Sequence, residues 1–394
     1  MPDRRPLNIL QISSTRKRGG SGASAMMLVK KLFERGHNVI YVCRESSLGY
    51  RELYKKGVKT ITSIDMKSGF KPSIAFIKSY RRDIQCLKSI IKAEKIDIVH
   101  MHSSPEGWRG TLAVMRMKNR PALIRSRHIV VPVKRNIANL WMFNRMTDSV
   151  IAVNEGIRQN YFDHGKYDKE KIVTIYDGVD ADRFDPSKYD RMKVRKELGI
   201  SENTPLIAVI ARIAKVKGHN FMIDAMKRII QKFPDAILAI AGQRGRKQNV
   251  GLYEKLVNKT IKMGLKKNIR FLDFREDVPE ILAAADIFVL PSIGSEGSSR
   301  GTLEAMAMAK PCITTTVGIL PEIVEDEVTG ILVKPEDSDA IANAVIDLLS
   351  NKNKATLMGE RAREKILKDF TEDAMVEKVE NLYYRILEKR GKLN

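Results

Sequence analysis

"DIFVLPSIGSEGSSRGTLEAMAMAKPCITT", residues 286–315, decides the fold class of this chain. The apolar run Ile287–Leu290 is typical of a buried strand, and a Gly/Ser-rich turn follows it. A short helical segment then carries Glu304, before a second strand-like run at Cys312–Thr315. The order strand, helix, strand predicts parallel strands joined by a crossover helix, which is the building unit of an α/β fold.

The same alternation extends along the whole chain, which at 394 residues is too long for one compact core. The first set of strand-like runs comprises Leu7–Ile12, Asn38–Cys43, Ile96–Met101, Ala122–Arg125, Ser149–Val153 and Ile172–Ile175. The set that follows the polar stretch 185–205 comprises Leu206–Ala211, Ala236–Ala241, Ile269–Phe271, Ile287–Leu290, Cys312–Thr315 and Gly330–Val333. Helix-length segments between the runs include Ala23–Arg35, Ile74–Ala93 and Gly156–Asp163. We therefore expect two doubly wound, Rossmann-like domains that face each other across a cleft.

The domain boundaries follow from the polar stretch and from the last helix. We place the first domain at residues 1–185 and the second at residues 186–374. The final segment puts Met375, Val379 and Leu382 on one helical face, and such an apolar face must pack on a core. That core could belong to either domain, and we expect residues 375–394 to cross back to the first.

The charge is high and uneven. The formal net charge is +23, and +17 of it falls in residues 1–185. Between Arg109 and Arg135 eight residues are basic and none is acidic. A solvated surface is one interpretation, and a field that attracts anionic partners is the other. We favour an anionic membrane surface and expect no nucleic-acid partner, because no RNA-binding signature and no aromatic residues accompany these charges.

Cysteine usage and hydropathy predict the compartment. Cys43, Cys86 and Cys312 are odd in number and far apart, which favours reduced core thiols over a disulfide framework or a zinc site. No uninterrupted apolar stretch approaches the ~18 residues of a membrane helix. We expect a cytoplasmic protein, peripheral on the cytoplasmic face of a membrane if the basic surface binds one.

Polar residues that could carry chemistry gather at strand ends of the second half. Glu296 lies in the loop after one strand, and Glu304 lies in the helix, whose N-terminus offers N–H groups to an anion. Arg212 and Lys217 follow the first strand of this half, at the edge where open α/β sheets bind ligands. Two cations and a helix N-terminus would stabilise a diphosphate, and the carboxylates would bind hydroxyls, as a sugar nucleotide requires. The alternative is an N-cap loop with two surface glutamates beside solvated cations.

A glycine loop in the first half supports a different hypothesis. "RKRGGSGASA", residues 16–25, spells Gly-x-Gly-x-x-Ala from Gly20, and Glu45 ends the next strand-like run, as in a dinucleotide fingerprint. In a dinucleotide fold the first glycine directly follows the strand, whereas residues 13–19 intervene here. A nicotinamide dehydrogenase therefore remains a minor alternative.

The chain resembles the retaining family 4 glycosyltransferases, or glycosyl transferases group 1, of the GT-B fold. The stretches that carry the resemblance are "VTIYDGVDADRFDP", "ARIAKVKG", "FLDFREDVPEILAAADIFVLPS", "SEGSSRGTLEAMAMAKPCITTTVGILPEIV" and "TGILVKPED". The first half is similar more loosely, through "GGSGASAMMLVKKLFERGHNV" and "DIVHMHS". The most specific element is Glu-x7-Glu followed by "AMA".

The resemblance implies roles for matching residues. Glu296 would bind hydroxyls of the transferred sugar, Glu304 would bind the ribose, and Arg212 with Lys217 would hold the diphosphate. His128 matches the active-site histidine that faces the donor sugar. The competing candidate is His102, which would line the acceptor side. The implied catalytic residues are Arg212, Lys217, Glu296 and His128. The implied donor-binding residues are Gly19, Gly20, Arg212, Lys217, Glu296, Gly297, Ser298, Ser299, Arg300, Gly301, Thr302 and Glu304.

The implied reaction moves a sugar from a nucleotide-diphosphate donor, UDP by default, to an acceptor hydroxyl, with retention at the anomeric carbon. The acceptor would be a lipid-linked or lipopolysaccharide-type glycan. We expect no metal, because no Asp-x-Asp occurs in the strand-end loops before Glu296, and no cofactor besides the nucleotide-sugar co-substrate. Ser298 and Ser299 replace the family's usual aromatic residue and glycine, so the donor sugar stays open. Two alternatives are a nucleotide-sugar 2-epimerase of the same fold and a non-catalytic protein that binds anionic membranes.

Overall fold

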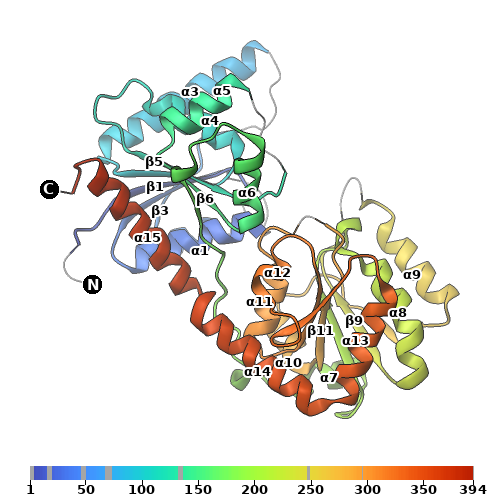
Figure 1. The fold of residues 1–394 in the computed structure, drawn as a ribbon. Helices are drawn as coiled ribbons and strands as arrows, with labels where there is room; N and C mark the ends of the chain where they lie inside the picture. Colours follow the sequence, from blue (N-terminus) through green and yellow to red (C-terminus); the bar gives the residue numbers. More distant parts are fainter. Residues whose placement is uncertain are drawn as a thin grey trace. The chain divides into compact units, whose positions relative to one another are not determined.

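The computed structural model describes residues 4–15, 20–45, 50–66, 73–131, 136–245, 249–294 and 296–393. The chain forms two compact units (Figure 1). The first unit comprises residues 1–177 together with 372–394, and the second comprises residues 178–371. Each is an α/β unit built around its own parallel sheet, which confirms the predicted fold class of two doubly wound sheets.

The first unit contains a seven-stranded parallel sheet in the order β3-β2-β1-β4-β5-β6-β7. Its strands are β1 (Asn8–Ser13), β2 (Asn38–Cys43), β3 (Lys59–Ile61), β4 (Ile98–Met101), β5 (Ala122–Arg127), β6 (Ser149–Ala152) and β7 (Ile172–Thr174). Its α-helices between the strands are α1 (Gly20–Glu34), α2 (Tyr50–Lys55), α3 (Ile74–Ala93), α4 (Ser104–Val114), α5 (Ile137–Trp141) and α6 (Glu155–His164). The central strands are buried on both faces, which explains why they read as continuous apolar runs rather than alternating ones.

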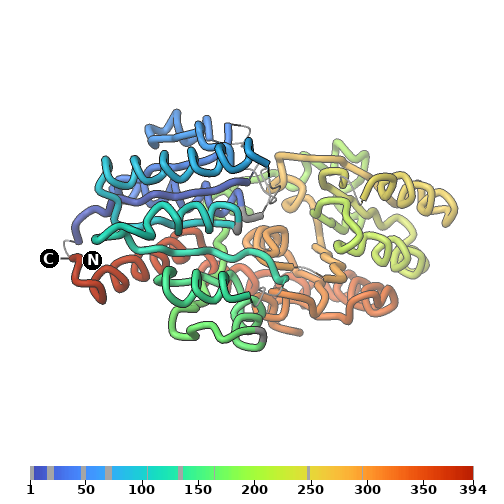
Figure 2. The backbone as a smooth tube through the Cα atoms, turned by 90° about the horizontal axis from the view of Figure 1, so that it is seen from above, coloured from blue at the N-terminus to red at the C-terminus, as the bar shows by residue number. Residues whose placement is uncertain are grey.

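The C-terminal helix α15 (Glu372–Lys389) belongs to the first unit. Val376, Val379 and Leu387 of α15 lie in one hydrophobic cluster with Leu7 and Ile9, and α15 packs along α1. Figure 2 shows the helix, at the red end of the colour scale, among the elements of this unit. The prediction that the last helix crosses back to the first domain is confirmed.

The second unit contains a six-stranded parallel sheet in the order β10-β9-β8-β11-β12-β13. Its strands are β8 (Leu206–Ile210), β9 (Ile237–Ala241), β10 (Ile269–Phe271), β11 (Ile287–Leu290), β12 (Cys312–Thr315) and β13 (Gly330–Val333). Its α-helices are α7 (Arg191–Leu198), α8 (His219–Lys232), α9 (Leu252–Lys262), α10 (Val278–Ala284), α11 (Arg300–Ala307), α12 (Leu320–Ile323), α13 (Ser338–Ser350) and α14 (Lys352–Asp369). The strand order reverses between β8 and β11, so the carboxyl ends of these two strands mark the position where doubly wound sheets bind ligands.

Part of the basic run 109–135 is internal rather than exposed. The Arg109 guanidinium donates to the Asp83 carboxylate at 2.8 Å, and both side chains are 3% exposed. Arg125 is buried as well and donates to the hydroxyl of Thr147 at 2.8 Å. Arg120 pairs with Asp148, with a shortest distance of 2.7 Å between nitrogen and oxygen. The interpretation of this run as surface charge is therefore wrong for Arg109 and Arg125, whereas Arg120 is paired but still 20% exposed.

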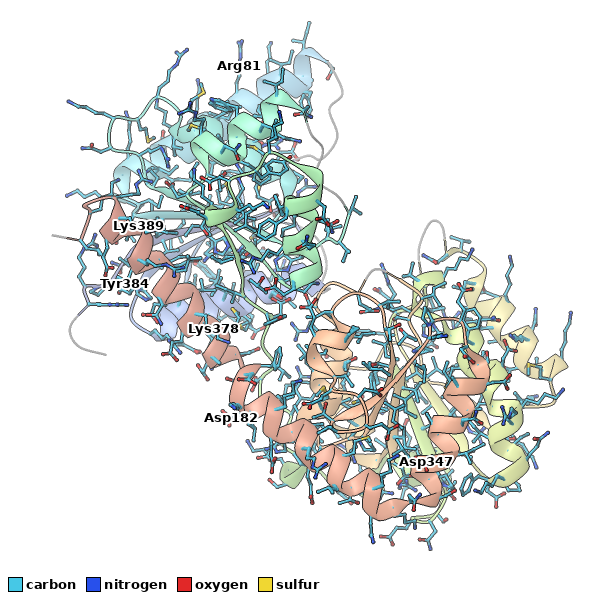
Figure 3. The ribbon with its side chains drawn as sticks, in the orientation of Figure 1. Arg81, Asp182, Asp347, Lys378, Tyr384 and Lys389 are labelled. Carbon is cyan, nitrogen blue, oxygen red and sulfur yellow. The ribbon has the colours of Figure 1, made fainter. Side chains whose placement is uncertain are left out.

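Other cations of the first unit do lie on its surface. Arg116 and Lys118 are exposed, and so is Arg81, which points outward from α3 in Figure 3. Lys134 and Arg135 lie outside the described residues. Among the helices of the described part of the chain, none combines the length and the apolar character that crossing a bilayer demands.

Candidate functional site

The loops after β8 and β11 meet at the carboxyl edge of the second unit's sheet. Arg212 follows β8 and is exposed, and Lys217 ends a 3₁₀ turn at Lys215–Lys217. Gly218 has φ +65°, and a Cβ there would lie 1.7 Å from the carbonyl oxygen of Pro291, which follows β11. Only glycine permits this approach. It is reinforced by the Ile293 amide, which donates to the Val216 carbonyl at 2.9 Å.

Glu296 is held inside this junction. Its side chain is 2% exposed, and its carboxylate contacts the Lys217 ammonium and accepts a hydrogen bond from the Ser292 hydroxyl at 2.5 Å. A buried carboxylate needs such partners, because the interior cannot otherwise solvate its charge. Gly318, at φ +58°, leaves room for the Glu296 backbone, since a Cβ at Gly318 would lie 2.1 Å from the Glu296 carbonyl oxygen.

The N-terminus of α11 reaches the same edge. Ser299 precedes the helix with φ +44°, and its hydroxyl lies 3.0 Å from that of Thr302. A Cβ at Gly301 would lie 2.8 Å from the Ile210 carbonyl, so the first turn abuts the end of β8. The Thr302 and Leu303 amides donate to the Ser299 carbonyl. Within the described ranges, the amides of Arg300 and Gly301 have no such partner, which leaves them available to an anion.

Glu304 lies one turn into α11, and its side chain is 15% exposed. Burial raises the pKa of its carboxyl, because the charged form loses solvation, while the neighbouring cations Arg300 and Arg183 partly offset this rise. The Arg300 guanidinium lies 3.6 Å from the Glu304 carboxylate. Hydroxyl groups of a ligand that donate to this carboxylate would replace part of the solvation that it loses on burial.

Two features of this edge are not evident from the sequence. His219 begins α8 and is buried, and burial lowers the pKa of its imidazole to about 4, so the ring beside Lys217 is neutral at pH 7. Ser292 gives Glu296 its hydroxyl partner. The only signal for either residue is its position directly after a strand or a 3₁₀ turn, and that signal is shared by many structural residues.

In the first unit, histidines gather at the carboxyl ends of β4 and β5. His128 follows β5, is 7% exposed, and places Nδ1 3.8 Å from a carboxylate oxygen of Asp177. His102 follows β4, and its ring stacks at 6.0 Å on that of His128 and at 4.4 Å on that of His100. Gly20 begins α1, whereas Gly19 lies outside the described residues.

The structure therefore brings Lys217 and Glu296 into contact and places the first turn of α11 against the end of β8, which Arg212 follows. Separately, it stacks the two histidines predicted in the first half. In the described part of the chain, no cluster of three His, Cys, Asp or Glu side chains has the arrangement of a metal site.

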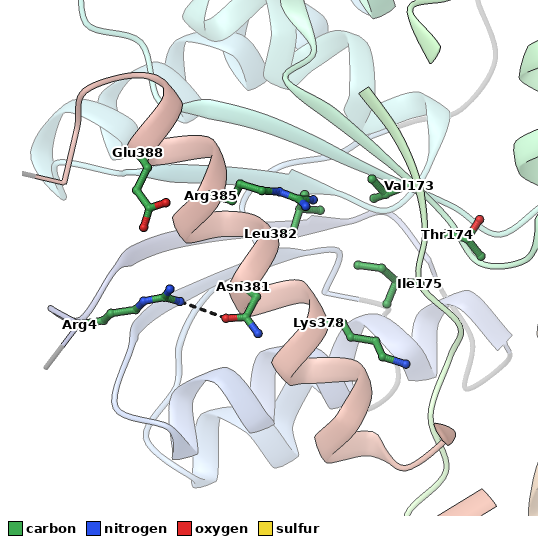
Figure 4. A pocket seen from close by; sticks show the side chains of 9 residues that line it. All are labelled: Arg4, Val173, Thr174, Ile175, Lys378, Asn381, Leu382, Arg385 and Glu388. Carbon is green, nitrogen blue, oxygen red and sulfur yellow. Dashed lines mark hydrogen bonds between the residues drawn. The ribbon is translucent and has the colours of Figure 1, made fainter. Parts of the chain in front are cut away.

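A hollow of about 590 Å³ lies elsewhere in the first unit, between β7 and α15 (Figure 4). Val173, Ile175 and Leu382 line it with apolar groups, and Arg4 donates to Asn381 at 3.0 Å beside it. None of the residues predicted for the site lines this hollow.

Comparison with known protein families gives two matches that together span most of the chain. The family described as "Glycosyl transferases group 1" matches residues 190–365. The family described as "Glycosyltransferase Family 4" matches residues 18–183. The first match contains Arg212, Lys217, Glu296 and Glu304, and the second contains His102 and His128.

Two curated proteins are similar over most of their length. The chain is 30% identical over 331 residues to the UDP-Gal:alpha-D-GlcNAc-diphosphoundecaprenol alpha-1,3-galactosyltransferase of Escherichia coli, covering 81% of this chain and 84% of that protein. It is 27% identical over 384 residues to the N-acetyl-alpha-D-glucosaminyl L-malate synthase of Bacillus anthracis, covering 95% and 97%.

Solved structures share the fold at lower identity. A glycosyltransferase from Rickettsia africae has a TM-score of 0.86 at 23% identity, covering 97% of this chain and 99% of that one. The Anabaena protein HepE, crystallised with UDP and glucose, has a TM-score of 0.80 at 20% identity, covering 95% and 99%.

Proposed function

Because the chain belongs to the group 1 glycosyltransferases, we propose that it transfers a sugar from a UDP-sugar to a hydroxyl of a lipid-linked or lipopolysaccharide-type glycan. We further propose that the transfer retains the configuration of the anomeric carbon and needs no metal. The observation that carries the proposal is the junction of Lys217, Glu296 and the first turn of α11 at the carboxyl edge of the second unit's sheet.

The assignment of the donor rests on the chemistry of that junction. A diphosphate requires cations and N–H donors, which Arg212, Lys217 and the amides of Arg300 and Gly301 supply. The Lys217 ammonium has three protons, so it can keep its contact with Glu296 and still donate to a phosphate oxygen. The uridine base is supported by the name of the Escherichia coli relative and by the UDP complexes of HepE.

Each of the two carboxylates would bind a different end of the sugar nucleotide. Glu296 is fixed by Lys217 and Ser292 and would accept hydrogen bonds from hydroxyls of the transferred sugar. Glu304, farther along α11, would accept from the ribose hydroxyls. A carboxylate accepts several hydrogen bonds in preferred directions. The two glutamates would therefore orient the donor, and they would not neutralise the charge of its phosphates.

The chemical step needs stabilisation of a leaving diphosphate. As the bond between the anomeric carbon and the phosphate oxygen breaks, negative charge grows on that oxygen, and Arg212, Lys217 and the α11 amides would receive it. The acceptor hydroxyl forms the new bond to the anomeric carbon, and its proton passes to the departing phosphate oxygen. In this scheme the preoriented cations take the place of a divalent metal, and Glu296 need not act as a nucleophile.

The assignment of the acceptor rests on two independent observations. The Escherichia coli relative is named for a diphosphoundecaprenol-linked substrate. The first unit exposes Arg81, Arg116 and Lys118 on its surface, which suits the approach of an anionic lipid-linked glycan. For the first unit we propose the roles that the family resemblance implies, contact with the donor sugar for His128 and with the acceptor for His102.

A donor-depletion screen tests the proposal without knowledge of the acceptor. Purified protein is incubated with UDP-, GDP- and ADP-sugars, with and without EDTA, and slow hydrolysis is followed by release of the nucleoside diphosphate. We expect UDP release from one UDP-sugar, unchanged by EDTA, with the α-anomer of the sugar formed first. Release of GDP or ADP alone would overturn the choice of base, and loss of release in EDTA would overturn metal independence.

Three measurements separate the alternatives, the first of them in the same incubation. A 2-epimerised sugar nucleotide formed without an acceptor would indicate an epimerase in place of a transferase. Binding of NADH in a fluorescence titration would favour the dehydrogenase. Full biological activity of Glu304→Gln without any turnover of a sugar nucleotide would favour the non-catalytic membrane-binding protein.

A further inference from the structure

In the first unit, a network of buried polar side chains runs across the neighbouring strands β1 and β4 and connects them to α15. Gln11 of β1, His100 of β4 and Tyr383 of α15 are all 0% exposed. The Tyr383 hydroxyl lies 2.6 Å from Nδ1 of His100 and 3.0 Å from Nε2 of Gln11. The oxygen of the same Gln11 amide, Oε1, lies 2.7 Å from Nε2 of His102. Four polar side chains, from β1, from β4 and the residue just after it, and from α15, thus form one continuous network.

The Gln11 amide points its nitrogen at Tyr383 and its oxygen at His102, and this orientation sets the direction of the other hydrogen bonds. The Gln11 amide nitrogen can only donate, so the Tyr383 oxygen accepts from it and gives its own proton to Nδ1 of His100. His100 then carries its proton on Nε2 and donates it to the Ser126 hydroxyl at 2.8 Å. The Gln11 carbonyl oxygen can only accept, so His102 must carry its proton on Nε2.

This arrangement leaves one acceptor unused. His102 is 4% exposed, and within the described ranges its Nδ1 has no hydrogen-bond partner. The His102 ring stacks on that of His128, whose two ring nitrogens also lack hydrogen-bond partners among the described residues. A buried polar atom without a partner is uncommon, and a ligand hydroxyl is one group that can supply the missing partner. The unused lone pair therefore lies next to the residue assigned to the active site.

The charge state of the histidines agrees with these tautomers. Burial lowers the pKa of His100 to about 3 and that of His102 well below its ordinary value, and the neighbouring histidines lower both further. Both rings are thus neutral at pH 7, and each has one N–H and one lone pair.

We propose that Tyr383 and Gln11 are positioning residues that hold His102 as its Nε2–H tautomer, so that His102 Nδ1 accepts a hydrogen bond from the acceptor hydroxyl. The inference rests on the proposed glycosyl transfer. It assigns a function in the reaction to the C-terminal helix, whose Tyr383 lies 372 positions from Gln11 in the sequence.

The amide of Gln11 is the part of the network that Tyr383 orients. Without the Tyr383 hydroxyl, the amide nitrogen loses its acceptor, and the amide is free to rotate by 180°. In the rotated state it donates to Nε2 of His102, and the ring proton moves to Nδ1. His102 would then present a donor where the acceptor hydroxyl needs an acceptor.

The variant Tyr383→Phe tests this proposal, and Tyr384→Phe is its matched control. Tyr384 is the next residue of α15, is 2% exposed, and donates from its hydroxyl to the Arg5 carbonyl at 2.9 Å, away from the network. Long-range ¹H–¹⁵N spectra of histidine-labelled full-length protein report the tautomer of His102, with the signal assigned through His102→Asn. We expect the Nε2–H tautomer in the wild type and in Tyr384→Phe, and a mixture with Nδ1–H in Tyr383→Phe.

Kinetics give a second readout. With the diphosphoundecaprenol-linked GlcNAc that the Escherichia coli relative is named for as the acceptor probe, we expect kcat/KM to fall about tenfold in Tyr383→Phe, the worth of one hydrogen bond, and not in Tyr384→Phe. Gln11→Met should have the same effect, and the double variant should lose no more than either single variant, because both substitutions break one chain. Additive losses would overturn the proposal and leave two separate structural roles.

The two readouts separate this inference from the proposed function. An Nδ1–H tautomer of His102 in the wild type, or an unchanged tautomer in Tyr383→Phe, would overturn the positioning role whatever the enzyme's activity. Failure to turn over any sugar nucleotide would overturn the proposed function, since the tautomer measurement does not depend on the reaction.

Discussion

The ammonium of Lys217 contacts the carboxylate of Glu296, although 79 positions separate the two residues in the sequence. Lys217 is 20% exposed and Glu296 is 2% exposed, so the pair stands at the boundary between the interior of the second unit and solvent. The cation therefore has two tasks. It compensates a buried charge, and in the proposed reaction it stabilises the leaving diphosphate.

Replacement of Lys217 by alanine tests both tasks. We expect Lys217→Ala to lower turnover of the sugar nucleotide roughly 10²–10³-fold, as loss of one preoriented donor does. It should also lower the free energy of unfolding by about 3 kcal/mol, because Glu296 is left with an uncompensated buried charge. Turnover is measured by nucleotide release and stability by urea denaturation.

Two further variants keep the two effects apart. The double variant Lys217→Ala/Glu296→Gln should recover stability, since a neutral amide replaces the charge, but it should not recover turnover. Lys215→Ala removes an exposed cation of the same 3₁₀ turn and should change stability little. Normal turnover in Lys217→Ala would contradict the assignment of the diphosphate site.

Gly218 offers a test of the geometry that brings the pair together. Gly218→Ala should destabilise the second unit and weaken donor binding, because the new Cβ would overlap the Pro291 carbonyl and displace Lys217. Gly199→Ala is the control, because Gly199 also has positive φ, at +67°, but a Cβ there meets nothing within 4 Å. That control should cost only about 1 kcal/mol. Equal losses of donor affinity in both variants, measured by calorimetry with UDP, would show that the close approach does not matter.

The buried carboxyl of Glu304 predicts a dependence of stability on pH. Burial holds its pKa in the folded chain above 4.5, the ordinary value, so its ionisation opposes folding. The stability contributed by the neutral form is complete below pH 4.5 and is lost as pH rises through the elevated pKa. Glu304→Gln should therefore raise the melting temperature at pH 7 to 8, and by less at pH 4.5, while it weakens donor binding.

Glu364→Gln provides the matched control for this pH series. Glu364 is exposed on α14 of the same unit, so its replacement should shift neither the melting temperature nor its dependence on pH. Scanning calorimetry from pH 4.5 to 8 gives the comparison. A lower melting temperature of Glu304→Gln at pH 8 would show that the carboxylate supports the fold rather than the ligand.

Replacing a buried arginine of the first unit should change stability, whereas replacing an exposed one should not, although both substitutions change the net charge equally. Arg109→Met should lower the free energy of unfolding by about 3–5 kcal/mol, because it leaves the buried Asp83 carboxylate without its cation. Arg116→Met removes one exposed charge and should leave stability unchanged.

Only the exposed charge should matter for anionic vesicles. Binding of the Arg116→Met/Lys118→Ala variant is expected to fall at low salt, and its difference from the wild type should shrink as salt screens the charges. Unchanged binding of that variant would reduce these cations to a role in solubility.

The sequence was informative where physical constraints are local. Strands of a parallel sheet are buried on both faces, so their continuous apolar runs could be located within a few residues. The helix predicted at Ile74–Ala93 has the bounds of α3. The resemblance to GT-B glycosyltransferases of group 1 is confirmed by the family and structural matches.

The sequence was less informative where charges are internal. The segment of α4 carries Glu106, Arg109 and Thr111, all buried, so polar residues interrupt the apolar pattern that marks a helix. Composition also counted Arg109 and Arg125 as surface charge, because a sequence does not show which cations have buried partners.

The residues of the candidate site could be named from the sequence, and their roles stay predictions, but their pairings could not be named. Glu296 and Glu304 lie around a helix start, and Lys217 follows a strand. These positions suggested a binding site for a diphosphate and for hydroxyl groups. The contact between Lys217 and Glu296 depends on tertiary structure, as does the approach of Gly318 to the Glu296 backbone. The link from Tyr383 to His100 spans 283 positions and leaves no local pattern.

The return of α15 to the first unit has a consequence for biosynthesis. Residues 1–177 emerge from the ribosome first, but the cluster around Leu7 and Ile9 lacks Val376, Val379 and Leu387 until translation reaches them. The second unit, residues 178–371, is a continuous segment and can complete its core earlier. We therefore expect one apolar face of the N-terminal sheet to stay uncovered while the second unit is synthesised. During that interval a chaperone that binds exposed apolar surface could associate with it.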